Sequence, residues 1–147
     1  MRIFRFAMVA PTALGALALL SSPASASTIP TQLSIGQVQL GPLGASVSVS
    51  LAFTCDPTLN VAFGDAFVGQ VSGHRLTQGG GSFVNNFPGV PCTGASESVI
   101  VQVYSSGSFA FKSGKKVLAS ADFTTYDPVA DTLSTTTVNG QAVTITK

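Results

Sequence analysis

The chain is 147 residues long, carries a formal net charge of +1 at pH 7, and has charged side chains at only 9% of its positions. Globular chains usually have about a quarter of their residues charged, so this surface is expected to be polar but almost uncharged. The composition excludes the basic surface on which nucleic-acid binding depends. The length suits a single domain.

The N-terminal segment has the layout of a secretory signal peptide. Two arginines near the start precede an apolar stretch over residues 7–20. Ala24-Ser25-Ala26 fits the small-residue pattern that signal peptidase recognises, which predicts a signal peptide over residues 1–26 with cleavage after Ala26. We therefore expect residues 27–147 to form one domain that is secreted and extracellular.

The alternative interpretation of this segment is a membrane anchor. A spanning helix needs about 20 consecutive apolar residues, whereas the apolar stretch here is shorter and contains Pro11. Cleavage would remove two of the seven basic residues and leave five against six acidic ones. We expect no membrane span after cleavage.

The first two predicted strands cover residues 32–40 and 45–55. In the second, one face carries Val47, Val49, Leu51, Phe53 and Cys55, and the other carries Ser, Ala and Thr. Because side chains of a strand alternate between two faces, this pattern predicts a half-buried strand. Cys55 is expected on the buried side.

The later segments have the same alternating, β-branched character. They are residues 59–67, 97–104, 117–123, 132–138 and 141–146. The last two are joined by Asn139-Gly140, which predicts a two-residue hairpin turn because both residues tolerate positive φ.

Clusters rich in Gly and Pro separate these segments and exclude long helices from residues 27–147. The clusters are residues 41–44, 56–57, 79–81, 88–91, 105–108 and 127–128. Gly79-Gly80-Gly81 predicts a flexible hairpin tip. About seven short strands with turns between them predict an all-β domain, an antiparallel β-sandwich of the immunoglobulin-like kind. A small barrel is the alternative.

Cys55 and Cys92 are the two cysteines of the chain. In an oxidising compartment such a pair predicts a disulfide, and closing the loop should stabilise the fold by roughly 4 kcal/mol. Two free thiols are the alternative. A metal site built from both cysteines and His74, the only histidine, would lack a fourth ligand at a recognisable spacing, so we expect no metal.

Four segments carry a resemblance to a known group of proteins. They are the strand ending in Cys55, Pro91-Cys92-Thr93-Gly94, Val99-Ile100-Val101-Gln102-Val103, and Phe109-Ala110-Phe111-Lys112-Ser113-Gly114-Lys115 with Ala119-Ser120-Ala121 after it. Over most of residues 45–128 the chain resembles small secreted actinobacterial proteins with an immunoglobulin-like β domain of unknown function. The resemblance implies that fold and export, but no activity and no functional residue. Looser relatives often carry a cysteine before Asp-Pro, whereas this chain has Tyr126-Asp127-Pro128, so a second disulfide is not implied.

Catalytic chemistry finds little support in the sequence. A Ser-His-Asp arrangement needs a histidine base, and His74 is the only candidate. Gly94-Ala95-Ser96-Glu97-Ser98 begins like a nucleophile elbow but ends in serine. Turn chemistry explains Asp56 and Asp127, which precede prolines, and Asp65, inside an apolar strand, predicts a bulge. We expect a protein that is not an enzyme, with no catalytic residue.

Two further patterns have structural interpretations. Gly79-Gly80-Gly81 lacks the lysine and the strand-loop-helix context of a phosphate-binding loop, and we expect no cofactor. Lys112, Lys115 and Lys116 form the one basic cluster of the sequence. They would attract an anionic surface, but lysines also protect sheet edges from pairing, and we prefer that interpretation.

Residues 85–92 form the strongest candidate for a binding loop. Two prolines stiffen the segment, an aromatic side chain offers an apolar anchor, and the predicted disulfide tethers its end. Such a rigid loop binds a partner at a lower entropic cost. The candidate partner-binding residues are Asn86, Phe87, Pro88 and Val90. The alternative is that Phe87 and Val90 cover one end of the sandwich.

These expectations combine into a secreted, non-enzymatic β-sandwich module that binds an extracellular protein or glycan partner through loops at one end. The alternative function is a secreted inhibitor or toxin-like effector that acts through the loop around Phe87. A third class, an enzyme, requires His74 beside an acid and a nucleophilic serine in one pocket.

Overall fold

The computed structural model describes residues 28–147, and the predicted signal peptide over residues 1–26 lies outside the described residues. The described chain is built from β-strands, joined by turns and one short 3₁₀ segment. They are β1 (Gln32–Leu40), η1 (Pro42–Gly44), β2 (Ser46–Thr54), β3 (Asn60–Ser72), β4 (Arg75–Pro91), β5 (Glu97–Ser105), β6 (Lys116–Asp127) and β7 (Thr132–Thr146). The all-β class is confirmed. No helix in this part of the chain is long and apolar enough to cross a bilayer.

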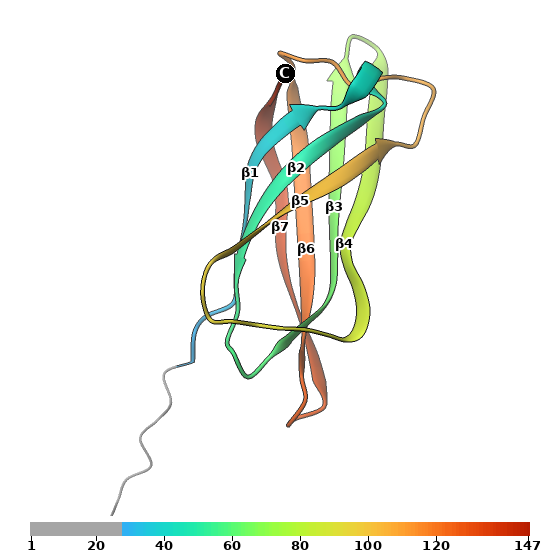
Figure 1. Cartoon of the computed structure of the whole chain (residues 1–147). Helices are drawn as coiled ribbons and strands as arrows, with labels where there is room; N and C mark the ends of the chain where they lie inside the picture. Colours follow the sequence, from blue (N-terminus) through green and yellow to red (C-terminus); the bar gives the residue numbers. More distant parts are fainter. Residues whose placement is uncertain (1–27) are drawn as a thin grey trace, which may run out of the picture.

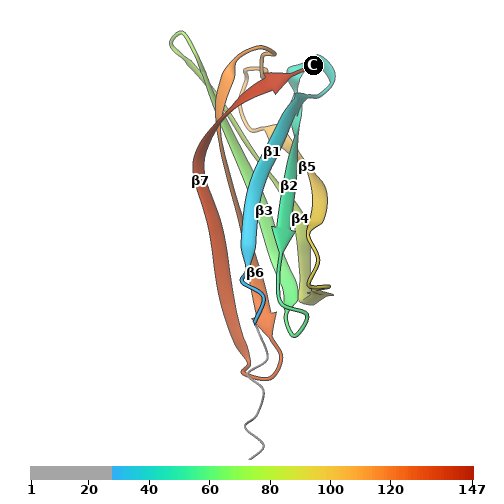
Figure 2. The ribbon, with the colours of Figure 1, turned by 90° about the vertical axis from the view of Figure 1, so that its left-hand side faces the viewer.

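The strands form one closed barrel in the order β1-β2-β5-β4-β3-β6-β7 (Figures 1 and 2). All neighbouring pairs are antiparallel except β1 and β7, which pair in parallel and close the barrel. The sequence predicted a sandwich of two sheets with a small barrel as the alternative. Within residues 28–147 the structure has the closed barrel.

Two of the junctions in this barrel are short. The residue pairs that make them are Gly79–Ser105 and Gly80–Tyr104 between β4 and β5, and Val38–Ile145 and Gln39–Thr146 between β1 and β7. The other junctions are longer ladders. The barrel therefore consists of a group of three strands, β1-β2-β5, and a group of four, β4-β3-β6-β7, and Figure 1 shows the first group crossing in front of the second.

Alternate side chains of the strands fill the barrel. The buried core includes Ile35, Val38, Val47, Val49, Leu51, Ala66, Val68, Val101, Val103, Phe111, Val117, Ala119, Ala121 and Ile145. The predicted alternation in residues 45–55 is confirmed, because Val47, Val49 and Leu51 are completely buried. Burying one such side chain contributes roughly 1.5–3 kcal/mol relative to leaving it exposed.

The predicted disulfide is also confirmed. Cys55 and Cys92 are bonded, with their Cα atoms 5.6 Å apart. Both are buried in a second apolar cluster with Phe53, Val61 and Phe123. The bond joins the residue after β2 to the residue after β4, and so ties the three-stranded group to the four-stranded group.

β4 shows that two predicted turns are wrong. The sequence predicted a hairpin tip at Gly79-Gly80-Gly81 and a turn over residues 88–91, but both segments lie within Arg75–Pro91. The hairpin between β3 and β4 turns at Gly73-His74 instead.

The glycines of β4 are explained by the close approach of β4 to β5. A Cβ on Gly79 would overlap the carbonyl oxygen of Tyr104, and a Cβ on Gly81 would overlap that of Gln102. Since neither contact involves a flexible side chain, glycine is needed at both positions.

β7 shows that the predicted C-terminal hairpin is wrong as well. Thr132–Thr146 is one strand, paired with β6 along its length. Asn139-Gly140 stands opposite Ser120 alone, where the pairing register shifts, and Gly140 has a φ of +59°. These two residues form a β-bulge, which uses a positive-φ glycine just as a hairpin turn does. The Gly140 N–H donates to the Ser120 hydroxyl oxygen at 3.0 Å.

Candidate functional site

The histidine that the sequence singled out lies at the tip of the β3–β4 hairpin. His74 is exposed there. A catalytic histidine needs an acid and a nucleophile within hydrogen-bond reach. The described hollow lined by Ser72, Arg75 and Ser108 near this tip includes neither His74 nor an acidic residue. Among residues 28–147, no group of three or more His, Cys, Asp or Glu side chains is placed to hold a metal ion.

The predicted binding loop is a protrusion from β4 rather than a loop at the end of the barrel. Residues 86–89 stand opposite Ala62 alone, as a bulge in the pairing between β3 and β4. Phe87, Pro88 and Val90 are exposed on it, and the side chain of Asn86 lies outside the described part of the structure.

Phe87 packs against β6, which lies on the far side of β3 from β4. Its ring lies on that of Tyr126 in β6, with the ring centroids 4.9 Å apart. The Tyr126 hydroxyl donates to Asp131 Oδ1 at 2.9 Å. This hydrogen bond, with a smaller effect of burial and of the charges of Asp131 and Asp127, raises the pKa of Tyr126. The bulge is therefore anchored by an aromatic pair that is itself held by an acid.

A larger candidate surface lies on the outside of the barrel, over the four-stranded group. Phe67 and Val71 on β3, Leu76 on β4 and Leu118 on β6 all point outward, with exposed fractions of 54%, 70%, 55% and 60%. We call these four side chains the outer apolar face. The solvent-facing side of an antiparallel sheet normally carries polar residues, so this face departs from the expected pattern.

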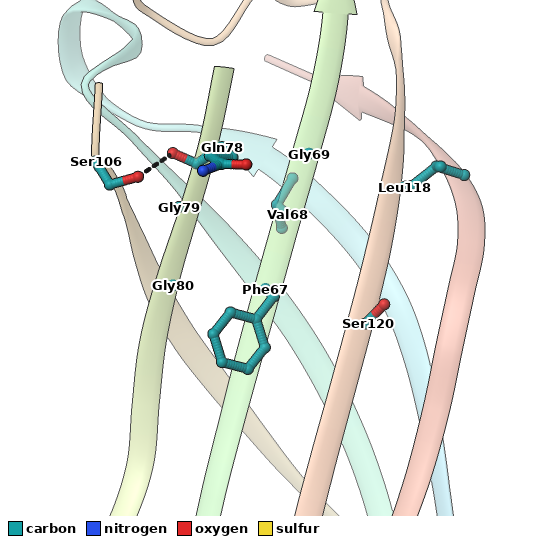
Figure 3. Close-up of a pocket in the computed structure, with 9 residues that line it drawn as sticks. All are labelled: Phe67, Val68, Gly69, Gln78, Gly79, Gly80, Ser106, Leu118 and Ser120. Carbon is teal, nitrogen blue, oxygen red and sulfur yellow. Dashed lines mark hydrogen bonds between the residues drawn. The ribbon is translucent and has the colours of Figure 1, made fainter. Parts of the chain in front are cut away.

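The pairing register brings the four side chains together. Val71 pairs with Leu76 across β3 and β4, and Leu118 pairs with Gly69, which lies between Val71 and Phe67 on the outward side of β3. Figure 3 shows Phe67, Gly69 and Leu118 on the neighbouring strands β3 and β6. The outer apolar face is therefore one continuous surface.

Glycines make this surface concave. A Cβ on Gly69 would meet no atom within 4 Å, and Gly80 lies under the ring of Phe67. The hollow around these residues has a volume of about 580 Å³ and is also lined by Gln78, Ser106 and Ser120 (Figure 3). A second hollow of about 380 Å³ shares Gly69 and Leu118 with it and extends to Leu76.

Charged residues mark the two ends of the outer apolar face. Lys116 lines the second hollow at one end. It pairs with Thr144 of β7, so it does not protect a free sheet edge as the sequence suggested. Asp65 and Asp122 stand opposite one another at the other end, and the Ser82 hydroxyl donates to Asp65 Oδ1. The face thus has a basic end and an acidic end.

Sequence reasoning did not find the outer apolar face. The predicted strand over residues 59–67 stopped before Val71, and residues 75–78 were not assigned to a strand. The signal was present in residues 65–71, where Phe67 and Val71 fall at the positions that face away from the buried Ala66 and Val68.

Comparison with known protein families finds no family model that matches this chain, and comparison with curated proteins finds no match either.

Proposed function

We propose that this protein is a secreted, non-enzymatic binding module, and that its outer apolar face docks onto an extracellular protein. The observation that carries the proposal is the continuous, concave surface of Phe67, Val71, Leu76 and Leu118. Soluble proteins rarely expose large apolar side chains in one contiguous patch unless the patch binds a partner.

The chemistry of the face favours a protein over a glycan. Three of its four side chains are aliphatic and offer no hydrogen bond to a sugar hydroxyl. Burying a hydroxyl without a partner costs free energy, whereas apolar side chains of a protein partner would fill the second hollow, which Val71, Leu76 and Leu118 line, without such a loss. Lys116 at one end and Asp65 with Asp122 at the other favour a partner whose charges are arranged in the opposite order.

Affinity capture with matched variants tests this function. The protein and the variants Leu118→Lys, Leu76→Lys and Val129→Lys are immobilised and exposed to the same extracellular material. Val129 is 92% exposed in the β6–β7 turn and lies outside the face. A protein retained by the parent and by Val129→Lys, but lost from both face variants, is then purified and its affinity measured by calorimetry. We expect each face variant to weaken that affinity about tenfold or more, as for a residue at the centre of an interface.

The same experiment can refute the proposal. Retention that is equal on all four surfaces would mean that the face does not bind. Hydrolysis of a model ester or glycoside that disappears on His74→Ala would mean that the protein is an enzyme.

The second candidate function is an inhibitor or toxin-like effector that acts through the bulge around Phe87. It is favoured by the exposure of Phe87 and Val90, at 57% and 53%, on a segment held by Tyr126 and the disulfide. If it is correct, replacing Phe87 and Val90 with Gly abolishes inhibition of a secreted protease without unfolding the domain. Inhibition unchanged by both substitutions would contradict it.

The strand order supports an immunoglobulin-like origin of the fold. In that fold strands A, B and E share one sheet with D, and strands C, F and G form the other. Here β1, β2 and β5 form one group and β3, β6 and β7 belong to the other, in the same chain order. We infer an immunoglobulin-like topology in which the fourth strand pairs mainly with the third. The resemblance to small secreted actinobacterial proteins, which rests on the four sequence segments described above, belongs to the same proposal.

Export through residues 1–26 is part of the same proposal. Disulfides persist in oxidising compartments and are rare in the cytosol, and the bond between Cys55 and Cys92 is compatible with an extracellular protein.

A further inference from the structure

A second candidate site lies at one of the two short junctions of the barrel, between β4 and β5. β4 and β5 are joined by two residue pairs and still approach closely where Gly81 meets the Gln102 carbonyl, and beyond that point they separate, as Figure 1 shows. The space between them has a volume of about 220 Å³, and we call it the β4–β5 groove. It is lined by Phe53, Val61, Phe83, Val84, Val90, Pro91, Glu97, Ser98 and Val99. The loop from β4 to β5 and the disulfide bound its far end.

β5 presents unpaired backbone groups to this groove. The Ser105 N–H donates to the carbonyl of Ala45 at 2.9 Å, on the β2 side. Because backbone groups alternate along an antiparallel ladder, Val99 and Val101 also face β2, whereas Ser98 and Ile100 direct their N–H and C=O groups toward the groove. Within residues 28–147, no strand pairs with Ser98 or Ile100 on that side.

β4 is a poor partner across the groove. The Cys92 N–H donates to the carbonyl of Leu59 at 2.9 Å, so the preceding residue, Pro91, directs its backbone nitrogen away from β3. A proline nitrogen carries no hydrogen to donate. Proline on an edge strand is one of the ways in which proteins prevent pairing. The β5 edge has no proline and no lysine over Ser98–Gln102, so it lacks this protection.

The side chains of the groove specify what would pair with β5. Phe53, Phe83 and Val99 present apolar surface, so alternate side chains of an added strand would have to be apolar. Glu97 is the one charged residue among those that line the groove, and its Oε1 accepts only from a neutral group, the Thr93 hydroxyl, at 2.7 Å. A basic side chain near that end would complement its charge.

We propose that the free edge of β5 binds an extended peptide segment of a partner protein by strand addition. Main-chain hydrogen bonds to Ser98 and Ile100 hold the segment, apolar side chains at alternate positions enter the β4–β5 groove, and a Lys or Arg meets Glu97. This is the mode in which a peptide extends an exposed sheet edge. The site is separate from the outer apolar face and does not depend on it.

Amide hydrogen exchange of the protein alone is the first test. We expect the Ser98 and Ile100 amides to exchange fast, while the Val99 and Val101 amides between them are protected. Protection of Ser98 and Ile100 that does not change with protein concentration would mean that the chain covers its own edge. Protection that increases with concentration would mean that a second copy occupies it. Either result overturns the proposal.

Selection from a phage library of random linear twelve-residue peptides is the second test. We expect enriched peptides with alternating apolar residues and a Lys or Arg, and shifts of the Ser98 and Ile100 amide signals when the synthetic peptide binds. N-methylation of the alternate peptide amides that face β5 should weaken binding about tenfold or more, and this control leaves the protein unaltered. Glu97→Gln should weaken binding of the basic peptides.

Variants separate this site from the outer apolar face. Ile100→Pro removes the N–H that faces the groove, and Val84→Lys places a charge in the groove if the proline variant does not fold. Both should abolish peptide binding, whereas Leu118→Lys should leave it unchanged. A selection that yields no binder, or peptides insensitive to N-methylation and to Val84→Lys, would overturn the proposal and leave the function of the outer apolar face untouched.

Discussion

At the scale of single residues, Gln70 fixes the long loop between β5 and β6. Gln70 is only 1% exposed. Its amide nitrogen donates to the carbonyl of Lys112 at 2.9 Å, and its amide oxygen accepts from the Lys112 N–H at 2.8 Å. The neighbouring Phe111 is buried in the core. The reciprocal pair thus holds the loop where Phe111 can complete the barrel.

Replacing Gln70 with Leu should therefore destabilise the fold. The Lys112 N–H and C=O would both lose their partner, and we expect the free energy of unfolding to fall by about 1–3 kcal/mol in urea denaturation. Gln102→Leu is the matched control, because Gln102 donates to the Ser48 hydroxyl on the exposed surface. Its effect should stay within about 0.5 kcal/mol. Equal effects of the two substitutions would refute the role of Gln70.

Asp56 gives a prediction about pH. Its carboxylate accepts from the Thr58 hydroxyl at 2.7 Å, the Thr58 N–H at 3.0 Å and the Ile29 N–H at 3.0 Å, and these bonds, the Thr58 hydroxyl first, lower the pKa of Asp56. A lowered pKa means that the stabilisation is present above the ordinary carboxyl value and is lost as the pH falls through the lowered one. NMR titration of the carboxyl carbon should show this lowered pKa, and Thr58→Val should raise it. A pKa that does not respond to Thr58→Val would contradict this assignment.

At the residue scale, the sequence predicted the disulfide, which follows from the number of cysteines. It missed the role of Gln70, which depends on a contact distant in sequence. Cys55 and Cys92 could be paired because two cysteines allow one pairing. Gln70 could not be identified as buried, because its partner is a backbone group more than forty positions away in the sequence.

At the scale of elements, strands whose two faces differ clearly were predictable. Residues 32–40 and 45–55 match β1 and β2 to within one residue at each end. β4 was missed because its glycines and prolines are typical of turns. Gly79 and Gly81 are needed because carbonyl groups of β5 approach them closely. The residue pattern of β4 alone does not reveal this approach.

Glycine substitutions test this account of β4. Gly79→Ala and Gly81→Ala should each lower the free energy of unfolding by about 1–3 kcal/mol, since the new methyl group would overlap the backbone of β5. Gly69→Ala is the control in a neighbouring strand, where a Cβ meets no atom within 4 Å. That substitution should stabilise by about 0.4–1 kcal/mol, because it restricts the unfolded chain. Similar losses at all three positions would contradict close approach as the cause.

At the scale of the whole molecule, the disulfide joins the two groups of strands across 37 residues of sequence. The double variant Cys55→Ala with Cys92→Ala should lower the free energy of unfolding by about 4 kcal/mol in the chain-entropy model. Reduced protein measured in the same denaturant series is the control, since it lacks the bond but keeps both side chains. A loss below about 1 kcal/mol in both samples would show that the barrel does not need the bond.

Closure of the barrel and formation of the outer apolar face both depend on how separate strands pair with one another. Neither can be predicted from the residue pattern of a single strand. Closure depends on pairing between β1 and β7, which stand at opposite ends of the described chain. The face depends on the register of β3 with β4 and β6, which places Leu76 and Leu118 beside residues of β3. The sequence predicted a non-enzymatic binding function carried by the segment around Phe87, and the outer apolar face is a second candidate that became visible only in the folded chain.

The most direct measurement for this account is biosensor binding of the immobilised protein to extracellular material, before and after digestion with protease and oxidation with periodate. We predict a binding signal that protease removes, that periodate leaves unchanged, and that falls about tenfold or more on Leu118→Lys but not on Val129→Lys. A signal that survives protease and is removed by periodate would identify a glycan ligand. A signal unaffected by Leu118→Lys would show that the outer apolar face is not the binding site.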